Sequence, residues 1–292
     1  MRRTPALIAA AIVTASVVVG GYLWATQALG SLPVIGTQSG STGPRLSWRA
    51  PAPMMAAQPA PALGPALLHP ATVTVNSPGF WSWSLLDRRT GEIVGSPNLG
   101  STNVTASMIK AWLAADYLRR AAEKRQTPSA ATLKRLTIMI RDSDNAAASF
   151  FSSALGGTAS ISRLVKICGL TDSRPNLNWA NAKMSARDSA RMGGCLADGR
   201  AAGPKWTEWV LGEMRAVRGV GRFGIIAALP PEEAKVTAMK NGWVVRSDGK
   251  WHVNCMAVGP EWSLAVMLVY PANRGFAHGA GICKSVAQQL MA

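Results

Sequence analysis

The sequence is poor in the residues that build metal centres and acidic surfaces. It has 3 histidines and 4 cysteines in 292 residues, and 15 acidic residues against 31 lysines and arginines. No two cysteines have C-x-x-C spacing and the histidines do not cluster with them, which argues against a metal site. No basic run is interleaved with aromatic residues, which argues against nucleic acid as the partner. We therefore expect no metal and no cofactor.

Acidic residues are absent from the first quarter of the chain. All 15 of them, and 27 of the 31 basic residues, follow residue 74, so residues 75–292 carry a net charge of +12. This excess predicts solubility and a loose attraction to an anionic cell envelope. Taken alone, the positive charge would also fit a different kind of function, that of a scaffold that binds anions.

The N-terminal region divides into two segments without acidic residues. Residues 1–27 hold an apolar run behind Arg2 and Arg3, which predicts a signal peptide or a membrane anchor. Residues 28–74 are rich in proline and alanine and predict a linker with polyproline character. Both interpretations of the first segment place the rest of the chain outside the cytoplasm, either secreted or anchored.

The four cysteines allow two disulfides in an oxidising compartment. The order of the predicted elements favours the pairs Cys168–Cys195 and Cys255–Cys283 over the other two pairings. We expect them to stabilise the fold and to take no part in chemistry.

Hydrophobic periodicity predicts an α+β domain over residues 75–292. Strand patterns stand at both ends and helical patterns between them, so we expect the first hairpin to join the last strands in one antiparallel sheet. An irregular loop is expected over 169–184. The predicted strands are 79–86, 92–95, 236–239 leading into 243–245, 251–258 and 262–269, and the predicted helices are 105–118, 130–140, 145–154, 160–167, 185–196, 205–214 and 279–290.

Three short motifs carry the chemical information. Ser107–Lys110 fits S-x-x-K, Ser143–Asn145 fits S-D-N, and Lys240–Gly242 stands where K-T-G is expected. A second S-x-x-K, Ser247–Lys250, contains Asp-Gly between two strand-like runs and predicts a hairpin turn.

The first motif places a nucleophile beside an amine. With Thr105 as the expected N-cap, Ser107 falls in the first turn of a buried helix, where its N–H is free to bind an oxyanion. Lys110 lies three residues further, on the same face. Burial would lower the pKa of Lys110 and suit it to take the serine proton.

With these motifs in this order, the chain resembles class A serine β-lactamases and the related penicillin-binding proteins over about residues 78–290. The resemblance implies an antiparallel sheet of about five strands flanked by helices. Ser143 follows Ser107 by 36 positions, which implies a reduced helical subdomain. We expect a monomer.

The resemblance also implies a role for each motif residue. Ser107 would be the nucleophile, Lys110 its base and Ser143 the relay that protonates the leaving nitrogen. The backbone N–H of Trp243 would be the second oxyanion donor.

The remaining motif residues are expected to bind substrate. Asn145 would hold Lys110 and a substrate amide. Lys240 would attract the substrate carboxylate, Asn241 would take the threonine's place, and Gly242 would let the substrate lie along the strand edge.

Two departures from the family pattern bear on turnover. Asn241 replaces the threonine of K-T-G, and Arg174 stands where class A enzymes carry the glutamate that activates water. Arginine does not act as a base at neutral pH. Asp172 is the nearest carboxylate in the sequence. We therefore predict acylation followed by slow hydrolysis.

The leading interpretation is an exported acyl-serine hydrolase or transferase of the cell envelope. Its substrates would be β-lactams or peptidoglycan peptides, as in a β-lactamase or a D-alanyl-D-alanine peptidase. The alternative is a catalytically weak penicillin-binding, wall-binding or sensor domain that keeps the fold.

Overall fold

The computed structural model describes residues 67–291, all within one compact unit, Pro61–Ala292. The predicted leader, residues 1–27, and the linker up to residue 66 lie outside the described part. Within that part, none of the helices combines the length and apolar character needed to cross a membrane.

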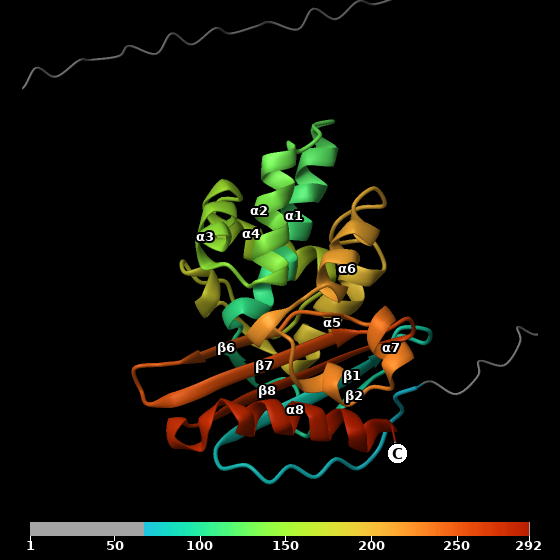
Figure 1. Ribbon diagram of the computed structural model, residues 1–292, viewed down its shortest axis with the longest axis vertical. Helices are drawn as coiled ribbons and strands as arrows, with labels where there is room; N and C mark the ends of the chain where they lie inside the picture. The colour runs from blue at the N-terminus through green and yellow to red at the C-terminus, as the bar shows by residue number, and fades with distance from the viewer. Residues whose placement is uncertain (1–66, 292) are drawn as a thin grey trace, which may run out of the picture. The chain divides into compact units, whose positions relative to one another are not determined.

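One antiparallel sheet carries the lower half of the domain in Figure 1. The strand order is β2-β1-β8-β7-β5, and β6 also pairs with β7. The predicted hairpin at the start of the domain therefore does join the last strands. The strands are β1 Phe80–Asp87, β2 Ile93–Gly95, β5 Ala238–Met239, β6 Gly242–Val245, β7 Lys250–Val258 and β8 Trp262–Pro271, with β3 Thr102–Val104 and β4 Lys183–Ser185 forming a separate pair.

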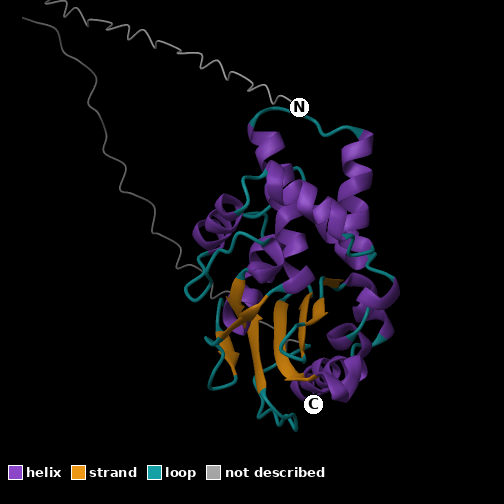
Figure 2. Ribbon diagram, turned by 90° about the vertical axis from the view of Figure 1, so that its left-hand side faces the viewer, coloured by secondary structure: helices purple, strands orange, loops and turns teal. Residues whose placement is uncertain are grey.

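Helices cover both faces of the sheet and gather at one end of the domain (Figure 2). Helix α8 packs on β7 and β8 from one side, and α5 packs on β1 and β8 from the other. The helices are α1 Lys110–Glu123, α2 Ala130–Arg141, α3 Asn145–Ala154, α4 Thr158–Cys168, α5 Ala186–Ala197, α6 Thr207–Arg215, α7 Pro231–Val236 and α8 Gly275–Met291.

Burial of apolar side chains on both sides of the sheet holds these layers together. Trp112 of α1, Trp262 of β8 and Phe151 of α3 are almost completely buried. Each such side chain contributes about 1.5–3 kcal/mol by leaving water. Helix α5 can approach the sheet closely because Gly193 has no side chain. A Cβ at this position would lie 2.1 Å from Ser263 Oγ.

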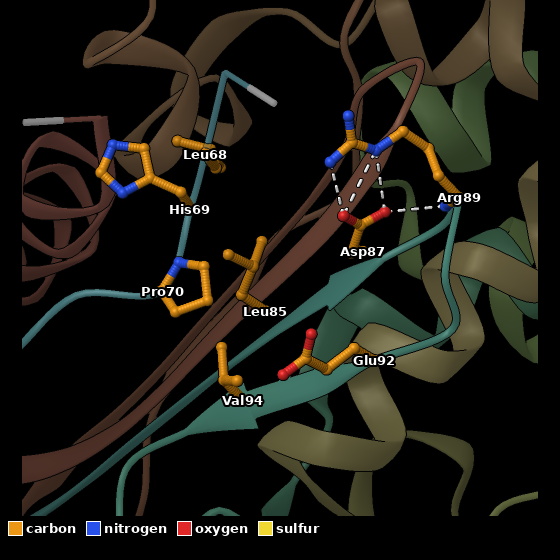
Figure 3. Close-up of a pocket in the computed structure, with 8 residues that line it drawn as sticks. All are labelled: Leu68, His69, Pro70, Leu85, Asp87, Arg89, Glu92 and Val94. Atoms are coloured by element: carbon orange, nitrogen blue, oxygen red, sulfur yellow. Dashed lines mark hydrogen bonds and ion pairs between the residues drawn. The ribbon is translucent and has the colours of Figure 1, made fainter. Parts of the chain in front are cut away.

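The segment before β1 runs beside α8. His69 N–H donates to Leu290 O at 3.0 Å, and Thr74 N–H donates to Gln289 Oε1 at 2.8 Å. Leu68 is buried against Leu85, and Figure 3 shows the small cavity that they line with the Asp87–Arg89 ion pair. Residues 67–74 of the predicted linker thus contact the domain.

Both predicted disulfides are present. Cys168–Cys195 joins α4 to α5, and Cys255–Cys283 joins β7 to α8.

Several element boundaries differ from the predictions. Residue 236 ends α7 and is not in a strand, and α8 begins at Gly275, before the predicted 279. The loop over 169–184 contains the 3₁₀ turn η2, Trp179–Asn181, and leads into β4. Strand β3 was not predicted, because three residues show no period.

Candidate active site

Ser107 lies in a 3₁₀ turn, η1 Ala106–Ile109, directly before α1. This corrects the prediction that it begins an α-helix capped by Thr105, whose side chain makes no capping hydrogen bond. Thr105 N–H donates to Ala182 O instead, and Ala106 has a φ of 45°. The turn aims Ser107 into a cleft, where its hydroxyl makes no hydrogen bond within the described structure.

Lys110 is fully buried at the first position of α1. Its Nζ donates to Asn145 Oδ1 at 2.7 Å, to Ser143 Oγ at 3.3 Å and, at short range, to Ser143 O. Burial lowers the pKa of Lys110 to about 8, against a smaller opposing effect of Asp144. A large fraction of the amine is therefore neutral near pH 8 and able to accept a proton.

Ser143 connects the two motif lysines. Its Oγ accepts from Lys110 Nζ at 3.3 Å and from Lys240 Nζ at 3.0 Å. Its φ of 59° turns the chain sharply between α2 and α3. Asp144 then caps α3, with its side chain accepting from Ala147 N–H at 2.6 Å. The S-D-N motif thus forms a turn that holds Ser143 between two amines.

Strand β6 has a free edge, because β7 is its only partner in the described sheet. Lys240 N–H donates to Met256 O at 3.0 Å, and Arg246 N–H donates to Lys250 O at 3.0 Å. N–H groups alternate between the two edges of an antiparallel strand. The odd-numbered Trp243 therefore directs its N–H to the free edge, as an oxyanion donor would require.

Gly242 allows close contact between β6 and the turn η1. A Cβ there would lie 2.4 Å from Thr105 O and 2.8 Å from Ser107 N, both backbone atoms. Any larger residue would push β6 away from Ser107. The sequence predicted a role for this glycine in substrate approach, and the structure adds contact between the two backbones.

The structure does not bring the Asn241 side chain into the cleft. Asn241 is 1% exposed, and its Nδ2 donates to Gly221 O at 3.1 Å and to Phe223 O at 2.9 Å. Its Oδ1 accepts from Met256 N–H at 3.3 Å, in the gap between β5 and β6. The side chain of Asn241 thus accepts the hydrogen bond from Met256 N–H that a backbone carbonyl would accept in a regular sheet.

The cleft around Ser107 has a volume of about 280 Å³. Besides Ser107, Asn145 and Trp243, it is lined by residues that the motifs did not reveal. They are Ala106, Ser149, Asn178, Trp179, Ala180, Asn181, Val244 and Arg246. Half of them come from the loop after Arg174, and no periodicity in the sequence singled them out.

Trp179 stands over Lys110. The Lys110 Nζ lies 4.9 Å from the centre of the Trp179 ring, within the range of a cation–π contact. The Trp179 Nε1–H donates to Ser149 Oγ at 3.3 Å. An indole therefore occupies the loop side of Lys110.

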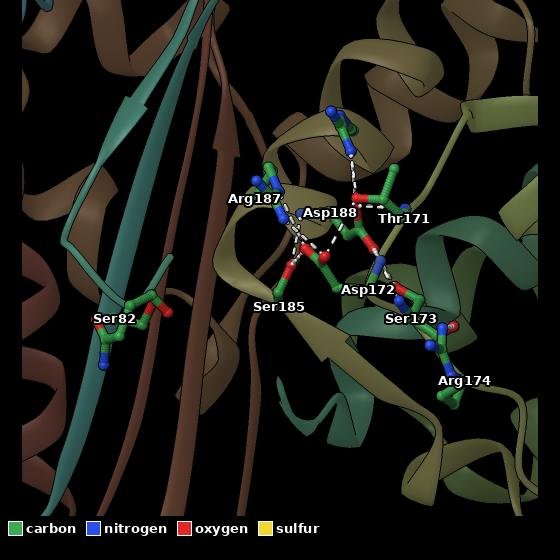
Figure 4. Close-up of polar contacts among 10 residues, drawn as sticks. Ser82, Thr171, Asp172, Ser173, Arg174, Ser185, Arg187 and Asp188 are labelled. Carbon is green, nitrogen blue, oxygen red and sulfur yellow. Dashed lines mark hydrogen bonds and ion pairs between the residues drawn. The ribbon is translucent and has the colours of Figure 1, made fainter. Parts of the chain in front are cut away.

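Neither Arg174, which stands at the position of the family glutamate, nor Asp172, the nearest carboxylate in the sequence, lines the cleft. Arg174 is exposed and donates from Nη1 to Ser173 O at 2.9 Å. Asp172 is bound by Arg187 and by Ser185 (Figure 4). Burial would raise the pKa of Asp172, but these hydrogen bonds outweigh it and lower the pKa. No Asp or Glu is among the residues that line the cleft.

Across residues 67–291 no group of three or more His, Cys, Asp or Glu is arranged to hold a metal ion.

The family of the chain follows from comparison with known proteins. A family model described as "Beta-lactamase enzyme family" matches residues 125–249, which include Ser143–Asn145 and Lys240–Gly242. The fold and motif order described above agree with it. The family-model match and the fold support the assignment of the chain to the serine β-lactamase superfamily.

Curated relatives are mycobacterial. "Putative lipoprotein LppW" of Mycobacterium tuberculosis is 30% identical over 206 residues, which cover 66% of this chain and 64% of that protein. The protein of the same name from Mycobacterium bovis matches to the same extent. The chain thus spans less than two thirds of the length of these relatives.

Solved structures share the superfamily fold. A β-lactamase from Chitinophaga pinensis aligns with a TM-score of 0.64 at 14% identity, over 74% of this chain and 94% of its own. A class A β-lactamase from Mycobacterium abscessus aligns with a TM-score of 0.57 at 15% identity, over 73% and 95%. At these identities the comparison establishes the fold alone.

Proposed function

We propose that this protein is an exported acyl-serine hydrolase or transferase of the cell envelope, acting through Ser107 on a β-lactam, an amide or a related ester. The observation that carries the proposal is the convergence of Lys110 and Lys240 on Ser143 Oγ, with Asn145, the other partner of Lys110, lining the same cleft as Ser107. A merely structural site has no need of two buried amines around one hydroxyl, because burying a charged group costs free energy.

In the proposed reaction the residues of the site act in turn. Lys110 accepts the Ser107 hydroxyl proton while Ser107 Oγ forms a bond to the carbonyl carbon. The N–H groups of Ser107 and Trp243 stabilise the resulting oxyanion. As the carbon–nitrogen bond breaks, Ser143 passes its proton to the nitrogen and regains one from the Lys110 ammonium. The product is an ester on Ser107.

The second half of the cycle lacks the usual base. No carboxylate lines the cleft, and Trp179 covers the loop side of Lys110. We infer that water attacks the Ser107 ester slowly. An acyl-enzyme of this kind persists or passes its acyl group to an amine, as a peptidase-like transferase would do.

An extracytoplasmic location fits this chemistry. The apolar run in residues 1–27 supports a signal peptide or an anchor, and the mycobacterial relatives are named as lipoproteins. We propose that residues 28–74 connect this segment to the domain that acts on the cell wall.

One observation favours a second candidate, a binding or sensor domain without turnover. The Ser107 hydroxyl makes no hydrogen bond, whereas Lys110 donates to Ser143 and Asn145. Catalytic hydrogen bonds are often long before substrate binds, so the enzyme remains our first choice.

Intact-mass spectrometry of the soluble domain tests the proposal. The domain is mixed with benzylpenicillin at high concentration and, separately, with a simple thioester, and the mass is followed over time. We expect a persistent adduct of one acyl group that is lost in Ser107→Ala. A short-lived adduct with accumulating product would contradict slow deacylation. No adduct from either compound would favour the binding domain.

A further inference from the structure

The cation expected to attract the substrate carboxylate is closed off from the cleft. Lys240 is completely buried and is not among the residues that line the cleft. Its Nζ donates to Ser143 Oγ at 3.0 Å and to Asn241 O at 3.1 Å. Burial, with the neighbouring Lys110, lowers the pKa of Lys240 well below its usual value. The Lys240 Nζ is thus committed to partners within the protein and does not line the cleft.

The Asn241 side chain, which was expected to bind substrate, is also absent from the cleft lining. The Asn241 side chain is committed to Gly221 O, Phe223 O and Met256 N–H in the core. A carboxylate on the leaving-group side of a substrate would therefore meet no uncommitted cation or side-chain donor from Lys240 or Asn241.

The charge in the cleft lies at the opposite end of β6. Arg246 is the one charged residue among those that line the cleft within the described structure. Its Nε is buried without a hydrogen-bond partner, and its Nη2 donates to Ala180 O at 3.4 Å. It makes no ion pair with any described acidic residue. A buried donor left unpaired is costly, and a ligand that accepts a hydrogen bond from it would recover that free energy.

A second unpaired atom lies at the same end. Asn181 Oδ1 is buried without a hydrogen-bond partner, and Asn181 also lines the cleft. It follows Ala180, whose carbonyl accepts from Arg246. The far end of the cleft thus presents a cationic donor and an acceptor that the protein itself leaves unsatisfied.

The strand geometry orients Arg246 toward the substrate. Side chains alternate along a strand, so Gly242, Val244 and Arg246 share one face. Gly242 contacts the nucleophile turn, and both Val244 and Arg246 line the cleft. Arg246 follows Trp243 by three residues, or roughly 10 Å along the strand. Lys240 and Ser143 lie in the other direction, on the leaving-group side.

We propose that Arg246 binds a carboxylate on the acyl side of the substrate, and that the leaving-group side is recognised without charge. This inference rests on the proposed acyl-serine function and adds the substrate class. The ligand is an acyl donor that carries a terminal carboxylate for Arg246 and an N–H group from which Asn181 Oδ1 would accept a hydrogen bond.

Four thioesters that differ in two places test this inference. The acyl part is glutarylglycine or its terminal carboxamide, and the thiol is thioglycolate or thioglycolamide. The rate of acylation of Ser107 is measured by intact mass and thiol release for all four. We expect the acyl-side carboxylate to be preferred over its carboxamide by about ten- to hundredfold, as a charge-assisted hydrogen bond implies. We expect no such preference for thioglycolate.

Variants assign the preference to one side chain. In Arg246→Gln the ratio between the two acyl donors should fall to near one, and Arg246→Lys should keep part of it. Lys250→Gln is the matched control, because it removes a positive charge from the same hairpin, at a residue outside the cleft lining. Its ratio should equal that of the unchanged protein.

The outcomes separate the two proposals. Equal rates with the two acyl parts, or a ratio unchanged in Arg246→Gln, would overturn the role of Arg246 and leave the acyl-serine function standing. A strong preference for the thioglycolate leaving group would also overturn it, in favour of Lys240. No acylation by any of the four would overturn both.

Discussion

At the scale of single residues, the site depends on two amines that share one hydroxyl. Lys110 and Lys240 both donate to Ser143 Oγ, and both are buried. Two ammonium groups this close repel each other, and burial penalises each charge. The arrangement therefore favours proton loss from at least one amine, and a neutral Lys110 could act as the base that the proposed mechanism requires.

The pH dependence of acylation tests this assignment. The pKa of Lys110 is lowered to about 8, and in the proposed mechanism the neutral amine is the active form. Below pH 8 the amine is mostly protonated, so the rate should rise about tenfold per pH unit and level off above pH 8.

The profile would be measured with a thioester whose own hydrolysis is subtracted at each pH. A rate that keeps rising toward pH 10, as an ordinary lysine would give, contradicts a base with a lowered pKa. Lys110→Arg is the control, because arginine keeps the charge and cannot lose its proton in this range.

At the scale of elements, long periodic segments were predictable and short connections were not. The pattern over 251–258 and 262–269 predicted β7 and β8 almost to the residue. The turn η1 and the lining of the cleft from Trp179 to Asn181 were not predicted. A 3₁₀ turn of four residues is too short to show a hydrophobic period in the sequence. The position of η1 depends on its contact with Gly242, and that of Trp179 on its contact with Lys110.

The motif residues show the same limit. The sequence placed Ser107, Lys110, Ser143 and Asn145 together, and the structure does bring them together. It could not reveal that the Asn241 side chain points into the core. That direction depends on the carbonyl groups of Gly221 and Phe223, which lie 20 and 18 residues before Asn241 and meet it only in the folded chain.

Asn241→Thr, which restores the family's K-T-G, tests whether this residue belongs to the core. A threonine hydroxyl has one proton and cannot donate to both Gly221 O and Phe223 O. At least one buried polar group would lose its partner, so we expect a loss of about 1–3 kcal/mol in the free energy of unfolding. Urea unfolding followed by tryptophan fluorescence measures it.

Ser247→Thr is a control for the added methyl group, because Ser247 is exposed in the turn after β6. A variant at position 241 that is as stable as the unchanged protein, and is acylated faster by thioglycolate esters, would mean that this side chain serves the cleft.

At the scale of the whole molecule, each disulfide joins neighbouring elements on a different side of the sheet. Cys168–Cys195 links α4 to α5 and closes 27 residues, whereas Cys255–Cys283 links β7 to α8 and closes 28. The cost of closing a loop in the unfolded chain depends on its length. The two bonds should therefore contribute nearly equal stability, although their surroundings differ.

Removing each bond separately tests this expectation. Paired Cys→Ala replacements at 168 and 195, or at 255 and 283, should each lower the free energy of unfolding by about 3–4 kcal/mol. Urea unfolding of the two variants and the unchanged protein gives both values, with a reduced sample as reference. Acylation should respond differently, because Cys255 follows Asn254, whose Nδ2 donates to Val104 O at 2.7 Å just before the nucleophile turn. We expect slower acylation only in the 255/283 variant, and equal losses of activity in both would mean that the bonds act through global stability alone.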